Sequence, residues 1–468
     1  NKTNFYPKKG KDRLLSMIEG RPDWCVSRQR VWGVPLPIFI NKKTKKPLKD
    51  QKVIDRIASI YEKQGSDCWF TDGPKVFLGD DYKSDDYEKL NDIVEVWFDS
   101  GSTHSFVLEK RKDLKWPADM YLEGSDQHRG WFHSSLLESC GTRGEAPFDS
   151  ILSHGFVVDG KGMKMSKSMG NVISPEEILK NYGADILRIW VSASDYSEDL
   201  RIDKNILIQH AESYRKIRNT FRFMLGNLKD KFEKQNFEKI KFNELDELDK
   251  YILHKLSIIG KSVDASLKDY NFHKLYKELL NFCTLDLSSF YFDIRKDVLY
   301  CDSLDSKKRK NCVIVLNIIL ESLLKWFAPI LVFTTEEIYG LINKNEESIH
   351  EKDFVRIPKT WENDLLYEKW SNLFKIKQEA NVAIEEKRIS KEIGSSLEAE
   401  IKLFINKEKF DLLGDIDMAE YFIVSKAEKN LVNEDEIKIE VIKASGEKCE
   451  RCWKILDKKC NRENCPIK

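Results

Sequence analysis

Asp119-Met-Tyr-Leu-Glu-Gly-Ser-Asp-Gln-His-Arg-Gly-Trp-Phe132 is the stretch that decides the fold of this chain. Residues 119–123 form a short, largely apolar run that ends at a glycine, which predicts a strand followed by a loop. Residues 131–140 are predicted to form the helix after this loop, and residues 150–154 a second strand. Strand, loop, helix and strand in this order predict a parallel α/β sheet.

Polar side chains gather where these predicted strands end. Ligands of open parallel sheets bind at the carboxyl ends of the strands. A carboxylate such as Glu123 suits an ammonium group or a ribose hydroxyl there, although a solvated loop acid would have the same appearance. We expect His128 and His133 to have packing or hydrogen-bonding roles. The predicted edge of the site carries Glu123, Asp126, Gln127 and His154.

The composition limits what the chain can be. A length of 468 residues favours about three domains. The 41% of hydrophobic residues is enough to form buried hydrophobic cores. No long apolar run is free of charges, so a membrane span is not expected. Basic and acidic side chains number 78 each, so any nucleic-acid surface must come from local clusters.

Beyond residue 174 the pattern becomes helical. Ser174 is expected to cap a helix that starts at Pro175, with Glu177 completing a capping box. Thr334, with Glu337 three residues on, is expected to cap a later helix. Further helices are predicted at 206–228, 247–268, 272–300, 309–327 and 365–389, which together indicate a helical bundle. Alternating apolar residues at 401–405 and 437–441 then predict a small β or α/β piece.

Three arginines follow one face of the first long helix. Arg215, Arg218 and Arg222 are spaced as a stripe, beside an apolar face that includes Ile217 and Phe221. The stripe is either a solvated helix face or a surface that contacts the backbone of an RNA. The sequence leaves both interpretations open.

Four of the ten cysteines crowd the end of the chain. The spacing C-x2-C-x7-C-x4-C can aim four thiolates at one zinc ion, which would fold a tail too short to bury a core. A disulfide pair or an unstructured tail is the alternative, since the second cysteine pair is more widely spaced than usual and the loop between the two pairs is short. The six scattered cysteines favour a reducing compartment such as the cytoplasm. The predicted ligands are Cys449, Cys452, Cys460 and Cys465.

The segment Lys164-Met-Ser-Lys-Ser168 is flanked by glycines and lies between a predicted strand and a capped helix. Two lysines three residues apart on such a loop can bracket a polyphosphate. An ammonium group is a mobile point charge, which suits charge that moves when a phosphate is displaced.

This string, followed by Met-Gly-Asn, resembles the second signature loop of class I aminoacyl-tRNA synthetases. Other segments narrow the resemblance to the isoleucyl-tRNA synthetases, with the valyl enzymes as the alternative. The resemblance extends over essentially the whole chain. The segments that carry it are Arg21-Pro-Asp-Trp-Cys-Val-Ser-Arg-Gln-Arg-Val-Trp-Gly-Val-Pro35, Val96-Trp-Phe-Asp-Ser-Gly-Ser-Thr-His104, Tyr121 to Phe132, Gly394-Ser-Ser-Leu-Glu398 and the cysteine tail.

The resemblance implies five parts. The expected parts are the C-terminal portion of a Rossmann-type catalytic core with connecting segments (1–173), a stem-contact segment (174–205), a helical anticodon-binding domain (206–390), a small α/β junction (391–443) and a zinc-binding tail with four cysteine ligands (444–468). It also implies the reaction, in which isoleucine and ATP with Mg²⁺ give isoleucyl-adenylate, which then esterifies tRNA(Ile). We expect a monomer.

The same resemblance assigns roles to single residues. Lys167 matches the lysine that contacts ATP, with Lys164 as its helper. Trp97 and Trp131 match aromatic residues of the amino-acid pocket, although core packing would also explain them. Arg28 and Arg30 are expected either to meet the tRNA acceptor end or to form salt bridges. The residues matching the adenylate site are Glu123, Gly124, Asp126, Gln127, His154 and Gly155.

Two features of the family are not found in this sequence. The His-Ile-Gly-His signature is absent, and so is the inserted editing domain. We therefore expect a C-terminal portion of the enzyme, truncated or partnered by a separate N-terminal half, that adenylates poorly by itself. A non-catalytic tRNA-binding module is the second hypothesis.

Overall fold

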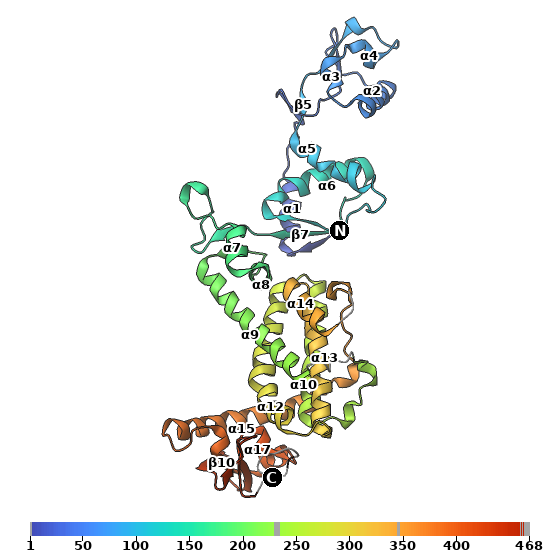
Figure 1. Ribbon diagram of the computed structural model, residues 1–468. Helices are drawn as coiled ribbons and strands as arrows, with labels where there is room; N and C mark the ends of the chain where they lie inside the picture. Colours follow the sequence, from blue (N-terminus) through green and yellow to red (C-terminus); the bar gives the residue numbers. More distant parts are fainter. Residues whose placement is uncertain (1, 229–234, 344–346, 459, 461, 463–468) are drawn as a thin grey trace. The chain divides into compact units, whose positions relative to one another are not determined.

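The computed structural model describes residues 2–228, 235–343, 347–458, 460 and 462. The chain divides into two compact units, which are described separately (Figure 1). The first unit contains Asn1–Val158 and Tyr196–Leu200, and the second contains Asp159–Asp195 and Arg201–Lys468. Among the described residues, no helix is both long and apolar enough to cross a membrane.

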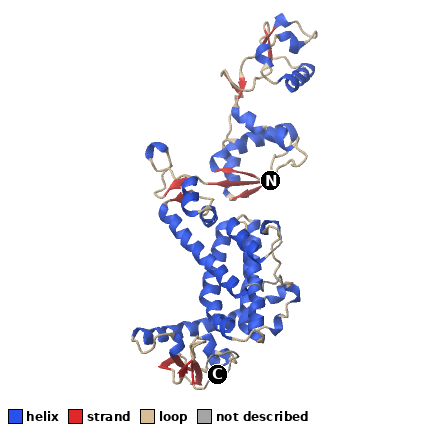
Figure 2. Ribbon diagram, in the orientation of Figure 1, coloured by secondary structure: helices blue, strands red, loops and turns tan. Residues whose placement is uncertain are grey.

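The first unit is built around a three-stranded parallel sheet, which confirms the predicted parallel arrangement. The strand order is β1 (Asn4–Tyr6), β7 (Ser150–His154) and β6 (Tyr121–Gly124). Strand β6 pairs with β7 in a register that places Gly124 opposite His154. Helices α1 (Lys9–Glu19) and α6 (Trp131–Arg143) contribute to the core beside the sheet (Figure 2). The buried residues of this core are Leu14, Tyr121, Phe132, Phe148 and Ile151.

A second, smaller core lies between residues 38 and 92 of the first unit. Trp69 is fully buried there, and its indole N–H donates to the carbonyl of Leu90 at 2.8 Å. Strands β3 and β4 form an antiparallel pair beside this core. This separate core was not predicted. The elements around it are β2 (Ser27–Arg28), β3 (Phe39–Asn41), α2 (Gln51–Gln64), α3 (Cys68–Thr71), α4 (Pro74–Leu78), β4 (Tyr87–Lys89) and β5 (Ile93–Val94), followed by α5 (Val96–Gly101).

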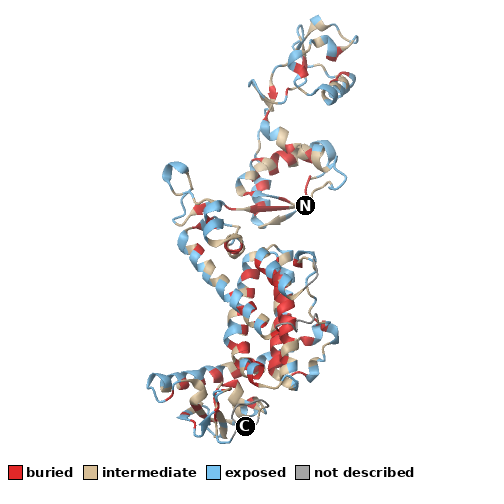
Figure 3. Ribbon diagram, viewed as in Figure 1, coloured by how far each residue is buried: buried red, intermediate tan, exposed pale blue. Residues whose placement is uncertain are grey.

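The second unit is mainly helical, as predicted. Helix α13 is deeply buried, since every residue from Val315 to Phe327 except Lys325 is buried and most of them are apolar (Figure 3). The predicted helix over 272–300 contains a π-helical segment, Phe282–Tyr291, between α11 and α12. The helices are α7 (Pro175–Tyr182), α8 (Ala184–Ala193), α9 (Lys204–Leu228), α10 (Glu247–Lys268), α11 (Phe272–Asn281), α12 (Phe292–Cys301), α13 (Lys307–Phe327), α14 (Val332–Ile342) and α15 (Asp364–Ile389).

A buried arginine joins the helices to the C-terminal piece. Arg295 of α12 donates to Asp249 of α10 at 2.9 Å and to Glu420 at 3.0 Å. Arg295 and Asp249 are both almost fully buried. Removing one partner of such a pair would leave an uncompensated charge, which typically costs about 3–5 kcal/mol.

The C-terminal piece carries a mixed three-stranded sheet in the order β11-β10-β12. Strand β10 runs parallel to β11 and antiparallel to β12. Its residues alternate between buried and partly exposed, as the sequence predicted. The strand Lys426–Leu431 was not predicted. The elements are β10 (Ala399–Ile405), α16 (Lys407–Leu413), α17 (Met418–Tyr421), β11 (Lys426–Leu431), β12 (Lys438–Lys443), β13 (Glu447–Lys448) and β14 (Ile455–Leu456).

Two predicted helix caps were wrong in detail. Helix α14 begins before Thr334, and Asp185 of α8 caps it by accepting the N–H of Thr334 at 2.8 Å. Ser174 caps α7 as predicted, but its hydroxyl contacts the carboxylate of Glu176 at 3.1 Å, where Glu177 was expected. In the first case a carboxylate from another helix satisfies the free N–H groups, which no local pattern can show.

Candidate functional site

The parallel pairing of β6 and β7 brings several predicted site residues together in the first unit. A Cβ atom built on Gly124 would lie 2.6 Å from Oδ1 of Asp126 and 3.8 Å from Cε1 of His154. Glu123, one residue earlier on β6, is exposed. Asp126 and His154 therefore lie around Gly124 at the end of the sheet, next along the chain to the exposed Glu123.

Gln127 connects this edge to helix α6. Its side-chain amide donates to Oδ2 of Asp126 at 3.0 Å, and its Oε1 accepts the N–H of Trp131 at 2.9 Å. A Cβ atom on Gly130 would overlap Oε1 of Gln127 and would lie 2.9 Å from the ring of Trp97. Gly130 is thus required for the close approach of Gln127 and Trp97. It was not among the predicted site residues, although a glycine directly before a helix was visible in the sequence.

The two tryptophans differ in their surroundings. Trp97 is 41% exposed and its ring lies against Gly130. Trp131 stacks face to face on Tyr121, with ring centroids 4.0 Å apart, and its indole N–H donates to the carbonyl of Ser100 at 2.9 Å. Trp97 is accessible to a ligand, whereas the packing of Trp131 matches the alternative of a core aromatic residue.

Gly155 is required by a backbone contact inside the first unit. A Cβ atom there would overlap the carbonyl oxygen of Glu198, so a larger residue at position 155 would displace the segment Tyr196–Leu200. His154 turns its Nδ1 toward the carbonyl of Gly155, at 2.8 Å. This contact fixes the ring of His154 at the end of β7.

The other histidines and Arg28 have structural contacts. His128 is buried with Nδ1 2.8 Å from the carbonyl of Ser125, and Arg21 lies 3.1 Å from the ring of His133. Burial lowers the pKa of both imidazoles, so they favour the neutral form. Arg28 donates to the carbonyl of Cys25 at 2.7 Å and lies 3.7 Å from Glu95, which is the salt-bridge alternative.

Two carboxyl groups, those of Asp99 and Glu138, have raised pKa values. Burial, with the nearby charge of Asp99, raises the pKa of Glu138 to about 8. Burial, with Glu95 as the next cause, also raises the pKa of Asp99. Helix α5 carries Asp99 and Trp97, and helix α6 carries Glu138. The protonated form of Glu138 therefore lets the two helices pack closely.

The lysine loop lies in the second unit. Lys164 and Lys167 are exposed, and within the described residues neither ammonium group has an ion pair or a hydrogen bond. Ser166 begins a short 3-10 turn, Lys167–Met169, and its hydroxyl accepts the N–H of Met169 at 3.3 Å. The loop thus presents two uncompensated positive charges to solvent.

Helix α9 displays the predicted arginine stripe. Ile217 and Phe221 are buried, so they face the bundle as predicted. Arg215, Arg218 and Arg222 are exposed, and no ion pair involves them in the part of the chain that the structure describes. The stripe is chemically free to bind phosphate.

Of the four predicted zinc ligands, the structure describes Cys449, Cys452 and Cys460, and Cys465 lies outside the described residues. The sulfur atoms of Cys449, Cys452 and Cys460 all lie within 4.8 Å of one another. The pair β13–β14 carries the first two cysteines as a knuckle. Burial raises the pKa of Cys452 to about 12.

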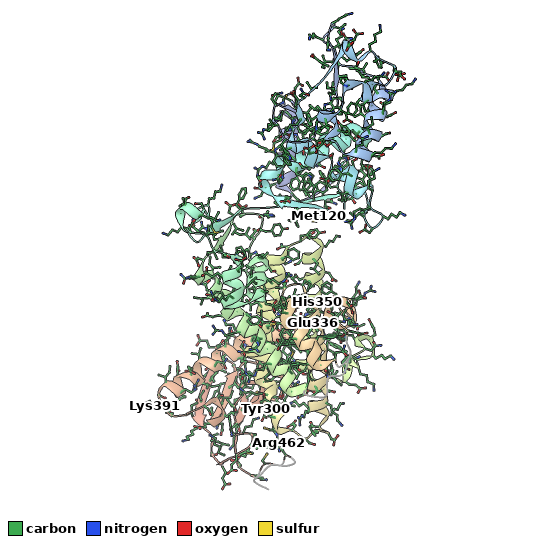
Figure 4. The ribbon with its side chains drawn as sticks, turned by 45° about the horizontal axis from the view of Figure 1, so that its top comes forward. Met120, Tyr300, Glu336, His350, Lys391 and Arg462 are labelled. Atoms are coloured by element: carbon green, nitrogen blue, oxygen red, sulfur yellow. The ribbon has the colours of Figure 1, made fainter. Side chains whose placement is uncertain are left out.

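An ion pair fastens this tail to helix α12. Arg462, labelled in Figure 4, donates to both carboxylate oxygens of Asp297, at 2.8 and 2.7 Å. Burial alone would raise the pKa of Asp297, but the bonds from Arg462 lower it below its ordinary value. The cysteine cluster is therefore held against the bundle by a bidentate ion pair.

Two protein families match the chain. Residues 1–203 match the family described as tRNA synthetases class I (I, L, M and V). Residues 249–403 match the anticodon-binding domain of tRNA ligase. The chain thus matches a class I tRNA synthetase domain that is followed by a match to an anticodon-binding domain. This confirms the resemblance that the lysine loop and the Tyr121–Phe132 segment indicated.

Relatives with curated names place the chain within this family. It is 64% identical to an isoleucine–tRNA ligase of Pelagibacter ubique, over 99% of this chain and 51% of that protein. It is 45% identical to an isoleucine–tRNA ligase of Caldanaerobacter subterraneus, over 96% of this chain and 50% of that protein. The chain spans about half the length of the curated relatives it matches.

Solved structures share the fold at low sequence identity. The ternary complex of Agrobacterium radiobacter K84 agnB2 LeuRS with tRNA and LeuAMS has a TM-score of 0.53 at 16% identity, covering 85% of this chain and 48% of that one. Mycobacterium tuberculosis methionyl-tRNA synthetase in complex with methionyl-adenylate has a TM-score of 0.50 at 16% identity, covering 72% and 58%. These likenesses concern the fold alone.

We predict that Glu138→Gln stabilises the chain by an amount that grows as the pH rises from about 5 to about 8. The folded pKa of about 8 lies above the ordinary 4.5, so the wild-type carboxyl favours folding less and less as the pH rises from 4.5 to 8. Glutamine never ionises, so the variant should gain about 2–4 °C in Tm at pH 9, or about 1 kcal/mol. At pH 5 the wild type and the variant should have the same Tm in calorimetry. An equal gain at both pH values would contradict the raised pKa.

Proposed function

We propose that this chain is part of an isoleucine–tRNA ligase, which activates isoleucine with ATP and transfers it to the 3′ end of tRNA(Ile). The observation that carries the proposal is the exposed, unpaired lysine loop in a class I synthetase whose curated relatives are named isoleucine–tRNA ligases. The same relatives extend well beyond this chain, so the whole reaction belongs to the longer protein.

Residues of the first unit would bind the amino acid and the adenylate. Glu123 would accept a hydrogen bond from the ammonium group or the ribose, and Asp126 with Gln127 would do the same from the neighbouring position. Trp97 would cover the aliphatic side chain of isoleucine. The support is the close grouping of Asp126, Gln127 and Trp97 around Gly124 and Gly130.

The lysine loop of the second unit would bind the phosphates of ATP. When the carboxylate of isoleucine attacks the α-phosphorus of ATP, the bond to pyrophosphate breaks and negative charge grows on the leaving group. Lys167, helped by Lys164, would stabilise this charge as an ammonium point charge. Mg²⁺ enters as part of the substrate MgATP. Both lysines are exposed and unpaired among the described residues, which supports this role.

We further propose one zinc ion in the tail, bound by Cys449, Cys452 and Cys460, with Cys465 as the fourth ligand. Sulfur atoms about 2.3 Å from a tetrahedral zinc lie about 3.8 Å apart, so a cluster within 4.8 Å fits the ion. Zinc would stabilise the thiolates and hold the knuckle, since so short a tail has little core of its own. Among the described residues no cysteine forms a disulfide, which fits a reducing compartment such as the cytoplasm.

The second unit would bind tRNA. The arginine stripe of α9 is exposed and unpaired within the described residues, so its guanidinium groups are available to the phosphates of an RNA backbone. A second surface lies at the cysteine knuckle, where Trp453 is 62% exposed and lines a cavity of about 320 Å³ with Arg451 and Tyr300. An exposed indole beside an arginine suits stacking on an unpaired base.

We predict that the full-length enzyme to which this chain belongs catalyses isoleucine-dependent exchange between pyrophosphate and ATP. Lys167→Ala should lower the exchange rate about 10²–10³-fold, because the variant lacks an ammonium group that stabilises transition-state charge. Its affinity for tRNA should stay unchanged in a filter-binding assay. Lys180→Ala, an exposed lysine on α7, is the matched control.

Three outcomes would contradict this assignment. If Lys167→Ala and Lys180→Ala lower the exchange rate equally, the proposed role of the lysine loop is wrong. Valine supporting faster exchange than isoleucine would favour a valyl enzyme. No exchange in the complete protein, with tRNA binding retained, would leave a non-catalytic binding module.

We predict that the affinity of this chain for tRNA(Ile) falls as salt increases. Replacing Arg215, Arg218 and Arg222 with glutamine should flatten the plot of the logarithm of affinity against that of salt concentration, by about 1 in slope for each arginine that meets a phosphate. Arg388→Gln, whose arginine is paired with Glu385, is the control. A salt slope identical in the triple variant and the control would show that the stripe is merely solvated.

We predict that the purified chain contains close to one equivalent of zinc by elemental analysis. Cys452→Ser should lose the metal, whereas Cys140→Ser, an exposed cysteine on α6, should retain it. Chelation should increase proteolysis of the tail after residue 444, because the knuckle loses its cross-link. Full zinc content in Cys452→Ser would overturn the proposed ligand set.

A further inference from the structure

Two polar side chains stand at the two ends of the lysine loop. Asp159 precedes the loop, and its Oδ1 accepts the N–H groups of Lys161 at 3.0 Å and of Met163 at 2.8 Å. These bonds close the first turn, together with the bond from the N–H of Gly162 to the carbonyl of Asp159 at 2.8 Å. The start of the loop is therefore shaped by a single carboxylate.

Asn171 stands at the other end and contacts both the start and the middle of the loop. Its side-chain amide donates to Oδ2 of Asp159 at 2.8 Å and to the carbonyl of Lys164 at 3.3 Å. Its Oδ1 accepts the N–H of Ser166 at 2.9 Å. The bond to Asp159 thus closes a ring of chain that contains Lys164 and Lys167.

The segment has little other side-chain support. Within the described residues, every side-chain hydrogen bond of residues 161–171 joins two members of the segment 159–171. The side chains of Lys164, Lys167 and Ser168 are exposed. The hydrogen bond from Asn171 is also the largest cause of a lowered pKa at Asp159, so the carboxylate is ionised at neutral pH.

We propose that Asp159 and Asn171 are positioning residues that hold the lysine loop in the shape in which Lys164 and Lys167 can reach a polyphosphate. The proposal rests on the proposed function for the identity of that ligand. A loop closed in advance loses less conformational freedom when its lysines engage the phosphates. Neither residue needs to touch the substrate.

The two side chains form an isosteric pair, which allows a reciprocal exchange. In Asn171→Asp two carboxylates face each other, and in Asp159→Asn two amides do. In the double variant Asp159→Asn/Asn171→Asp, the new asparagine Oδ1 can still accept from residues 161 and 163 while its amide donates to the new aspartate. That aspartate can still accept from Ser166. Only the longer bond to the carbonyl of Lys164 is missing.

The first experiment measures loop order directly in this chain. Limited trypsin digestion followed by mass spectrometry gives the rates of cleavage after Lys164 and Lys167. We expect Asn171→Asp to increase both rates at least fivefold, and the double variant to return to within about twofold of the wild type. Asn181→Asp, the same chemical change at an exposed position on α7, should leave both rates unchanged.

The second experiment measures pyrophosphate exchange in the complete enzyme. We expect Asn171→Asp to raise KM for ATP about tenfold or more, with a smaller change in KM for isoleucine and none in Tm. The double variant should restore KM for ATP to within about threefold. A purely structural role would move Tm and both KM values together.

The outcomes separate this proposal from the proposed function. If Asn171→Asp matches Asn181→Asp in digestion and exchange, or if the double variant is no better than Asn171→Asp, the positioning role is wrong. If the unmutated complete enzyme shows no isoleucine-dependent exchange, the proposed function fails, while the digestion rates still decide whether the pair orders the loop.

Discussion

The parallel pairing of β6 with β7 is the constraint on which the candidate site depends. Its register sets Gly124 opposite His154, so the carboxyl ends of two strands open at one edge. Gly124 then leaves room for Asp126, and Gly130 leaves room for Gln127 and Trp97. The chemistry at this edge is therefore set by backbone pairing and by two positions without a side chain.

The second unit contains a buried, paired arginine and a loop with exposed, unpaired lysines among its described residues. Arg295 is buried and its guanidinium is paired with Asp249, Asp246 and Glu420, which ties helices to the C-terminal piece. The lysines of the 164–168 loop are exposed and unpaired among the described residues. A paired buried charge fixes structure, whereas an unpaired exposed charge stays available for a phosphate.

Much of the local structure could be predicted from the sequence. The strand over 150–154 and the helix over 247–268 were found at the bounds that the structure shows. The helix over 272–300 was found, but its π-helical middle was not, because the change to i→i+5 hydrogen bonding lies in the backbone and was not visible in the short apolar pattern. The cap of α14 was misassigned because its acceptor, Asp185, comes from 149 residues away.

The sequence by itself determined the family, the parallel order of the core and the candidate residues, because short motifs and apolar periodicity are local properties. Only the tertiary structure decided which of these residues meet. It showed that Trp131 packs on Tyr121, that Gly155 makes room for the carbonyl of Glu198, and that Asn171 reaches back to Asp159. Such contacts depend on distances between segments that are separated along the chain, and no local pattern of residues records them.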